Sequence, residues 1–442
     1  MDPRQLLEVL KGIFGLPDAP RGWFVELAGF LVGTLGFVAH RLDAAFFLLW
    51  EAGKLICIII VHVDDLALAH DGSAKMMNLV RQLREKYRFG SWEKLWDKPE
   101  GANYTGKKLR IIDEEKIGVS MPDFINGRLD YVEQNKKDDP HEEATPLEKA
   151  DFRTGVGGAH WVTSQYRIDK AFDVNQMQKQ QNHPLKGDLT KVNKIIKEMK
   201  ETAEFEYVIQ RVEEPMAVAT WSDSSLYGVK GEPLEDDDLQ EYDRHKVRSQ
   251  AGALVGVVAE KDLKSTEEVA VSFVDQRSRA THRAVISTFA AETAAALDAF
   301  GMGYYVRTFL VEIEKGWLKK GLLEYDEKDM TLRLISDCKS LYDHLCKDGA
   351  VPEDKWTAVY VAALKCGVSA GPGRDESKAG LMWVASRWQL ADVLTKGGLS
   401  RMFREIMASG VTRFHELSSQ ALKRQRLKEL EEKAESLADT HE

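Results

Sequence analysis

The first part of the chain switches between the hydrophobic period of a helix and that of a strand. Residues 21–35 and residues 73–87 carry apolar side chains at helical spacing. Between them, two runs rich in β-branched and aromatic residues flank Gly53 and predict a hairpin. A further hairpin is expected over residues 103–121. The pattern therefore predicts a small α+β domain in residues 1–124.

The pattern changes further along the chain. Residues 125–212 are less hydrophobic and mostly helical in spacing, and within them residues 135–151 are polar, contain two prolines and are expected to form a linker. Residues 213–400 show the order β-β-β-α-β-α-β, which predicts a mixed sheet with flanking helices. Residues 401–442 end in a charged helical tail. The expected fold class is a multi-domain α+β and α/β protein.

The helical region also carries a glycine cluster and a lysine cluster. Gly155, Gly157 and Gly158 lack the preceding strand of a dinucleotide-binding loop, so a tight turn is expected there. Residues 179–200 contain six lysines and two acidic residues. These lysines are consistent with a phosphate-facing surface and equally with a solvated helix face.

Composition narrows the class of protein. The chain has 442 residues, of which 30% are charged and 43% hydrophobic, as is typical of a soluble globular protein. Neither a signal peptide nor a membrane span is expected. Four cysteines fit no zinc spacing and no disulfide framework, which favours the reducing cytoplasm or nucleus. A net charge of −10 argues against a free-standing nucleic-acid binder, although local basic patches would serve.

The strongest candidate chemistry comes from four acids, each at the edge of an apolar stretch: Asp223, Glu292, Asp337 and Asp392. Any one of them alone is most simply a capping or surface carboxylate. Together, on consecutive strands and helices, they are expected to converge. Converging carboxylates repel one another and raise each other's pKa unless cations bind. Mg²⁺ or Mn²⁺ suits such an oxygen-only site, and two such ions promote phosphodiester hydrolysis.

A second acidic feature is the pair Asp64 and Asp65, which follows the apolar run "ICIIIVHV". We expect both side chains at the tip of a hairpin. Acidic side chains at such a tip either face solvent as part of a structural turn or bind a metal ion. No serine or cysteine lies in a nucleophile elbow, so no small-molecule substrate is inferred.

Seven short motifs occur in a fixed order between residues 11 and 400. They are "LKGIFGLPDAPRGWFVEL", "IVHVDDLALA", "NYTGKKLRI", "YRIDKAFDVNQM", "STFAAETAAAL", "SDCKSLYDHL" and "QLADVLTKGG". In this order they resemble the end of the pol polyprotein of Ty1/copia-type retrotransposons. The resemblance implies a partial reverse-transcriptase palm in residues 1–124, a thumb or connection region in 125–212 and a ribonuclease H domain in 213–400.

By the same resemblance, Asp64 and Asp65 match the polymerase aspartates that bind Mg²⁺. The four later acids match the ribonuclease H metal ligands, so the expected reaction is Mg²⁺-dependent cleavage of RNA in an RNA–DNA hybrid, recognised by groove shape and 2′-hydroxyls. The third palm carboxylate and the fingers would precede Met1, and His62 stands where the family carries tyrosine. We therefore expect no DNA synthesis by this chain alone.

Two alternatives remain open at this point. The chain is a catalytically inactive or domesticated remnant that acts as a binding module, or it is a subunit whose missing fingers come from other pol segments. Titration with a metal ion would separate the first alternative from an active nuclease, because an inactive remnant has no need to bind Mg²⁺.

Overall fold

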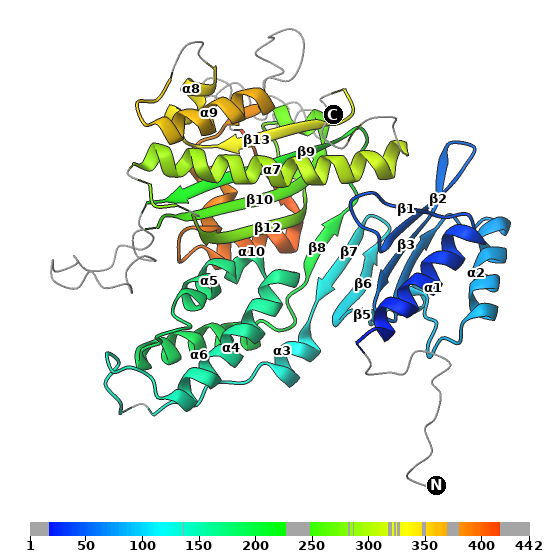
Figure 1. Cartoon of the computed structure of the whole chain (residues 1–442), viewed down its shortest axis with the longest axis horizontal. Coiled ribbons are helices and arrows are strands. Elements are labelled where there is room, and N and C mark those ends of the chain that lie inside the picture. The colour runs from blue at the N-terminus through cyan, green and yellow to red at the C-terminus, as the bar shows by residue number, and fades with distance from the viewer. Residues whose placement is uncertain are drawn as a thin grey trace, which may run out of the picture. The chain divides into compact units, whose positions relative to one another are not determined.

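The computed structural model describes most of the chain in two compact units (Figure 1). The N-terminal unit comprises Met1–Arg110 with Thr308–Glu324, and the C-terminal unit comprises Ile111–Arg307 with Tyr325–Glu442. The described residues are 17–135, 137–226, 248–281, 283–285, 287–316, 321, 324, 328–346, 351–368 and 380–415. Several sheets and many helices confirm a mixed, multi-domain α+β protein. The four finer domain boundaries stay predictions.

The N-terminal unit is built on an antiparallel sheet whose strands lie in chain order, β1-β2-β3-β4. The two predicted helices and the hairpin around Gly53 are confirmed. The bounds are α1 Ala19–Gly33, β1 Val38–Ala39, β2 Phe46–Glu51, β3 Lys54–His62, β4 Asp65–His70 and α2 Ala74–Lys86.

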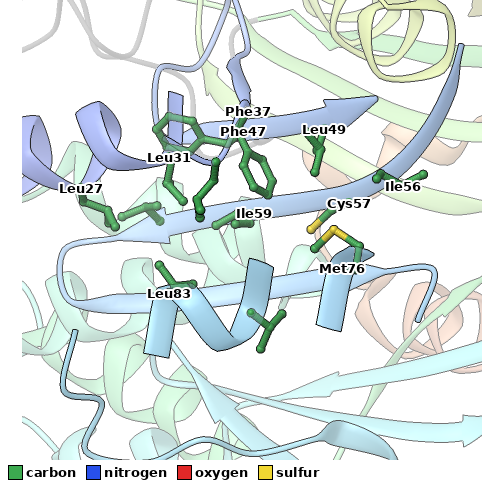
Figure 2. Packing of buried hydrophobic residues seen from close by; sticks show 13 residues of the cluster. Leu27, Leu31, Phe37, Phe47, Leu49, Ile56, Cys57, Ile59, Met76 and Leu83 are labelled. Atoms are coloured by element: carbon green, nitrogen blue, oxygen red, sulfur yellow. The ribbon is translucent and has the colours of Figure 1, made fainter. Parts of the chain in front are cut away.

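One hydrophobic core joins these helices to the sheet (Figure 2). Leu27 and Leu31 are one turn apart on α1, and both are fully buried. From α2, Met76 and Leu83 enter the same cluster, and the hydroxyl of Ser73 accepts a hydrogen bond from Met76 N at 3.3 Å and caps the helix. Full burial of such a side chain stabilises the fold by about 1.5–3 kcal/mol. The helical spacing seen in the sequence is thus the spacing of core contacts.

The strand β5 (Ala102–Tyr104) lies in the N-terminal unit, and β6 (Lys107–Asp113) spans the boundary between the two units. The C-terminal unit then begins with a mostly helical region, whose elements are β7 Lys116–Ser120, α3 Pro122–Arg128, α4 Pro146–Gln165, α5 Ala171–Lys179, α6 Lys186–Glu201 and β8 Tyr207–Gln210. The strand β5 pairs with β6, and β7 pairs with β8. The lysine-rich stretch noted in the sequence, residues 179–200, includes all of α6 except its last residue, Glu201.

Two expectations for this region are wrong. The proposed linker, residues 135–151, runs into α4, because Thr145 and Glu148 form a capping box and Pro146 occupies the first turn, where a proline is tolerated. The three glycines lie inside α4 and form no turn. A Cβ on Gly155 would lie 2.7 Å from Cγ2 of Val132, so this glycine permits close packing.

The rest of the C-terminal unit is a five-stranded mixed sheet in the order β12-β10-β9-β13-β14. The first three strands are antiparallel neighbours, and β13 and β14 run parallel to β9. This arrangement agrees with the predicted order β-β-β-α-β-α-β, except that two helices lie between the last two strands. The bounds are β9 Met216–Ser225, β10 Gln250–Ala259, β12 Ser272–Ala280, α7 Thr288–Lys315, β13 Thr331–Ser336, α8 Lys339–Cys346, α9 Lys355–Val368 and β14 Leu381–Trp383.

The long helix α7 lies across this sheet (Figure 1). Gly303 permits the close approach, because a Cβ there would lie 2.8 Å from Cδ1 of Leu332 and would overlap the hydroxyl of Thr220. The helix is thereby held against β9 and β13, the two strands that carry predicted site acids.

After β14 come a 3-10 turn, η7 (Leu390–Leu394), the helix α10 (Ser400–Ser409) and the short strand β15 (Val411–Thr412), which pairs with β11 (Val269–Ala270). The charged helical tail predicted for residues 401–442 includes most of α10 at its start and otherwise stays a prediction. Its remainder, residues 416–442, lies outside the described residues, as does the acidic insert after β9 at residues 227–247. Within the part of the chain that the structure describes, no helix has the length and apolar character needed to cross a membrane.

Candidate metal-binding active site

Asp223 lies on β9, in the middle of the five-stranded sheet, and is only 2% exposed. Burial raises the pKa of its carboxyl group, and the charge of Asp337 raises it further. Lys396 and the hydroxyl of Thr395 oppose this shift, and that hydroxyl donates a hydrogen bond to Oδ2 of Asp223. The paired residue on β10 is Gly252, where a Cβ would lie 2.8 Å from Cβ of Leu394. This glycine therefore lets the segment after η7 lie directly over Asp223.

Glu292 lies near the beginning of α7. The pKa of its carboxyl group is well above the usual range because the group is buried and because Asp223 and Asp337 repel its charge. Its Oε2 atom is buried and has no hydrogen-bond partner among the described residues. A buried carboxylate oxygen without a donor is costly, so this atom is available to a cation.

Asp337 directly follows β13. The indole N–H of Trp383 donates to its backbone carbonyl at 3.0 Å. The side-chain amide of Gln389 lies 3.4 Å from Oδ1 of Asp337 and 2.9 Å from the backbone carbonyl of Ser222. Gln389 thus ties the end of β13 to the strand that carries Asp223.

Asp392 is part of η7, with a side chain 18% exposed. Burial and the charge of Asp223 raise the pKa of Asp392 to about 6. The ammonium group of Lys396 lies 2.8 Å from Oδ1 of Asp392 and 3.6 Å from Oδ2 of Asp223. Burial lowers the pKa of Lys396, but the carboxylates of Asp223 and Asp392 outweigh this effect and raise it.

The structure thus brings the four predicted acids together around one lysine, from β9, α7, the end of β13 and η7. The negative charges of these carboxylates repel one another, and this repulsion contributes to the raised pKa of Asp223, Glu292 and Asp392. As the side chains lie, no three acidic, histidine or cysteine groups of the described residues are arranged to hold a metal ion. The ammonium of Lys396 supplies the positive charge at this point. The all-oxygen donor set and the unpaired Oε2 of Glu292 fit a hard divalent cation.

The other predicted pair, Asp64 and Asp65, lies in the N-terminal unit at the turn between β3 and β4. Both residues are exposed, as expected for a hairpin tip. Val63 adopts a left-handed conformation with φ of 54°, and its carbonyl accepts a hydrogen bond from the indole of Trp23 at 2.9 Å. Asp65 adds to the effect of burial in raising the pKa of Tyr104. No third metal-ligating group joins the pair within the described residues.

Sequence reasoning missed three residues that complete the site: Gln389, Thr395 and Lys396. All three flank Asp392 within the segment "QLADVLTKGG". The signal available was spacing, because Thr395 and Lys396 follow Asp392 by three and four residues, the separation at which side chains share one face of a helical turn.

Comparison with known proteins narrows the origin of the chain. No protein-family model matches it. Over 93 residues it is 32% identical to the retrovirus-related Pol polyprotein from transposon RE1 of Arabidopsis thaliana, and 31% identical over 93 residues to that from transposon RE2. This similarity supports a retrotransposon pol-derived protein. The match spans 21% of this chain and 6% of each relative.

Proposed function

We propose that the C-terminal unit is a ribonuclease H of the Ty1/copia type that cleaves the RNA strand of an RNA–DNA hybrid with Mg²⁺ or Mn²⁺. The observation that carries this proposal is the convergence of Asp223, Glu292, Asp337 and Asp392 on one point of a mixed sheet. The similarity to retrotransposon Pol polyproteins adds support.

In this proposal the four carboxylates hold the metal. The bound cations would supply an activated water and charge stabilisation for the departing oxygen. Lys396 neutralises part of the acid cluster in the absence of metal, and its side chain is 46% exposed, so its flexible stem can carry the ammonium away into solvent. Gln389 keeps Asp337 oriented toward Asp223. The raised pKa of Asp392 means that this residue ionises fully only above about pH 6, so metal binding should weaken below that pH.

For the N-terminal unit we propose the remaining part of a reverse-transcriptase palm, with Asp64 and Asp65 at the position of the polymerase aspartates. Their exposure at a hairpin tip is compatible with metal binding beside a primer end. Further pol segments are the partners that would complete such a polymerase.

A second candidate function is a catalytically inactive remnant that binds nucleic acid. The observation that favours it is the ion pairing of Lys396 with both Asp223 and Asp392, which neutralises part of the acid cluster without metal.

The deciding experiment is cleavage of a hybrid with a labelled RNA strand, compared between the wild type and Asp337→Asn. The amide keeps the shape of the side chain and removes the charge that would hold a cation. We expect the cleavage rate to fall by more than about 100-fold, as when a group that stabilises transition-state charge is removed. Glu267→Gln is the control, because Glu267 is exposed in the loop before β11 and forms no ion pair among the described residues.

The melting temperature without metal should stay level or rise in Asp337→Asn, since one repelling charge is gone. Equal cleavage by this variant and the wild type would place the metal site elsewhere. A wild type that binds the hybrid but neither binds Mg²⁺ nor cleaves would establish the inactive remnant.

A further inference from the structure

A cavity of about 450 Å³ lies in the C-terminal unit between α5, α6 and the beginning of α10. Two acids, Asp173 and Glu198, line it. So do five basic residues, Lys170, Lys191, Lys194, Arg401 and Arg404. The lining therefore carries a formal excess of three positive charges in a chain whose net charge is −10.

Some of these basic groups are held by ion pairs with acids that are partly or fully buried. Lys170 is 4% exposed, lies 3.3 Å from Asp173 and contacts Glu198. Arg404 lies 3.0 Å from the buried carboxylate of Asp169. These pairs shape the wall of the cavity and fix the direction of its donors.

Other basic groups are available to a ligand. The ammonium of Lys194 forms no ion pair or hydrogen bond in the described part of the chain, and the residue is exposed. Arg401 is 87% exposed and its only ion pair there is with Glu405 at 3.5 Å, a surface contact that a ligand can replace. The cavity therefore has basic groups held in place by ion pairs and exposed basic groups that can move to contact a ligand, and both kinds suit the binding of an anion.

The first turn of α10 lines the same cavity through Ser400 and Arg401, and Gly398, just before the helix, lines it as well. Leu399 caps this helix without a side-chain hydrogen bond, so no side chain of the N-cap residue competes for the first backbone N–H groups. These groups carry the positive end of the helix dipole and add to the charge of the lining.

The chain places this cavity beside the acid cluster. Lys396, which pairs with Asp223 and Asp392, is only two residues from Gly398 of the cavity lining, a Cα separation of at most about 7 Å. Gln176 also lines the cavity, and its amide lies 3.3 Å from Oε1 of the buried Gln250. The amide of Gln250 in turn donates to the backbone carbonyl of Leu394 at 3.5 Å, so both features connect the wall of the cavity to the segment that carries Asp392 and Lys396.

We propose that this basic cavity binds a phosphate of the nucleic-acid backbone, a few nucleotides from the phosphodiester at the acid cluster. The inference rests on the proposed function, since it takes the substrate at the acids to be a nucleic acid. Phosphate contacts position a duplex without reading its sequence, which suits an enzyme that recognises the shape of a hybrid. The cavity thereby sets which phosphodiester reaches the acids.

The test is binding of a fluorescent RNA–DNA hybrid by the full chain in EDTA, where no cleavage takes place. The variant Lys194→Glu/Arg401→Glu reverses two exposed charges that support no buried contact. The control is Lys197→Glu, which reverses an exposed charge on the same helix α6 outside the cavity lining. We expect the double variant to bind the hybrid about 10-fold or more weakly at 0.1 M salt. The plot of log affinity against log salt should become less steep by about 1–2, because each lost phosphate contact reduces the steepness of this plot by about 0.9.

The control should change affinity by less than about 3-fold, since a single distant charge makes no phosphate contact. Equal losses of affinity in the double variant and the control would indicate general charge repulsion and overturn the proposal. An unchanged affinity of the double variant would also overturn it. A second arm adds inorganic phosphate. Stabilisation of the wild type but not of the double variant, together with unchanged hybrid affinity, would assign the cavity to a free anion and overturn the nucleic-acid assignment.

The two proposals fail in different ways. A wild type that binds the hybrid with the expected cavity dependence but does not cleave it with Mg²⁺ would overturn the nuclease and leave the phosphate site standing. A wild type that cleaves the hybrid while the double variant binds as tightly would overturn only the phosphate site.

Discussion

Replacement of Asp392 by asparagine should stabilise the metal-free protein. The carboxylate of Asp392 is held beside Asp223 in a partly buried site, and these two effects raise its pKa from 3.8 to about 6. Asparagine has nearly the same shape and cannot ionise. The variant therefore keeps the contacts of η7 and loses the repulsion.

The size of the gain follows from the pKa shift. A shift of about two units, at 1.36 kcal/mol per unit, corresponds to about 3 kcal/mol at pH 7, where the carboxyl group is ionised in both the folded and the unfolded chain. The shift already includes the attraction of Lys396, which lowers the pKa of Asp392. We therefore expect Asp392→Asn to raise the free energy of unfolding of the C-terminal unit by about 2–3 kcal/mol, or its melting temperature by about 4–10 °C.

The pH dependence checks the cause. Because the folded-state pKa of Asp392 is raised, the folded wild type takes up a proton more readily than the unfolded chain as the pH falls through about 6. The wild type thus gains more stability on acidification than the variant, which lacks the contribution of this carboxyl group. The difference between them should fall to about half at pH 5 and vanish below about pH 4.

The assay is thermal and urea unfolding in EDTA from pH 7 to pH 5, with Glu405→Gln as control. That exposed residue should change stability by no more than about 0.5 kcal/mol. An Asp392→Asn variant that is less stable than the wild type at pH 7, or a stability gain that does not shrink on acidification, would refute the repulsion argument.

Two further predictions concern the lysine and the helix that complete the site. Lys396→Met should lower the melting temperature without metal, because the acids lose their positively charged partner. The variant should also need less Mg²⁺ for half-saturation, because the ammonium no longer competes with the metal ion for the acids. Calorimetric titration measures the Mg²⁺ affinity, and weaker Mg²⁺ binding by the variant would contradict the prediction. Gly303→Ala should destabilise the C-terminal unit by about 1–3 kcal/mol, since the added Cβ would lie 2.8 Å from Leu332. Gly301→Ala on the same helix, where a Cβ meets nothing within 4 Å, should be neutral or stabilising.

Local sequence patterns were sufficient for most elements of secondary structure. The helices α1 and α2 and the hairpin β2–β3 followed from apolar spacing and from Gly53, because these elements bury one continuous face in a single core. The order of strands and helices in residues 213–400 was equally readable. Local patterns failed around α4, where Pro146 and the three glycines suggested breaks. Close packing against Val132 makes glycine favourable there, and that contact joins residues far apart in sequence.

For the candidate site, the sequence by itself determined which acids are present, their chain order and their positions at the ends of buried strands and near the beginning of a helix. Only the tertiary structure decided that Asp223, Glu292, Asp337 and Asp392 act on one another, that Lys396 pairs with two of them, and that five basic residues line one cavity nearby. The reason is physical. Side-chain periodicity records the burial of each element, whereas electrostatic interactions depend on distances between elements that only the packed fold defines.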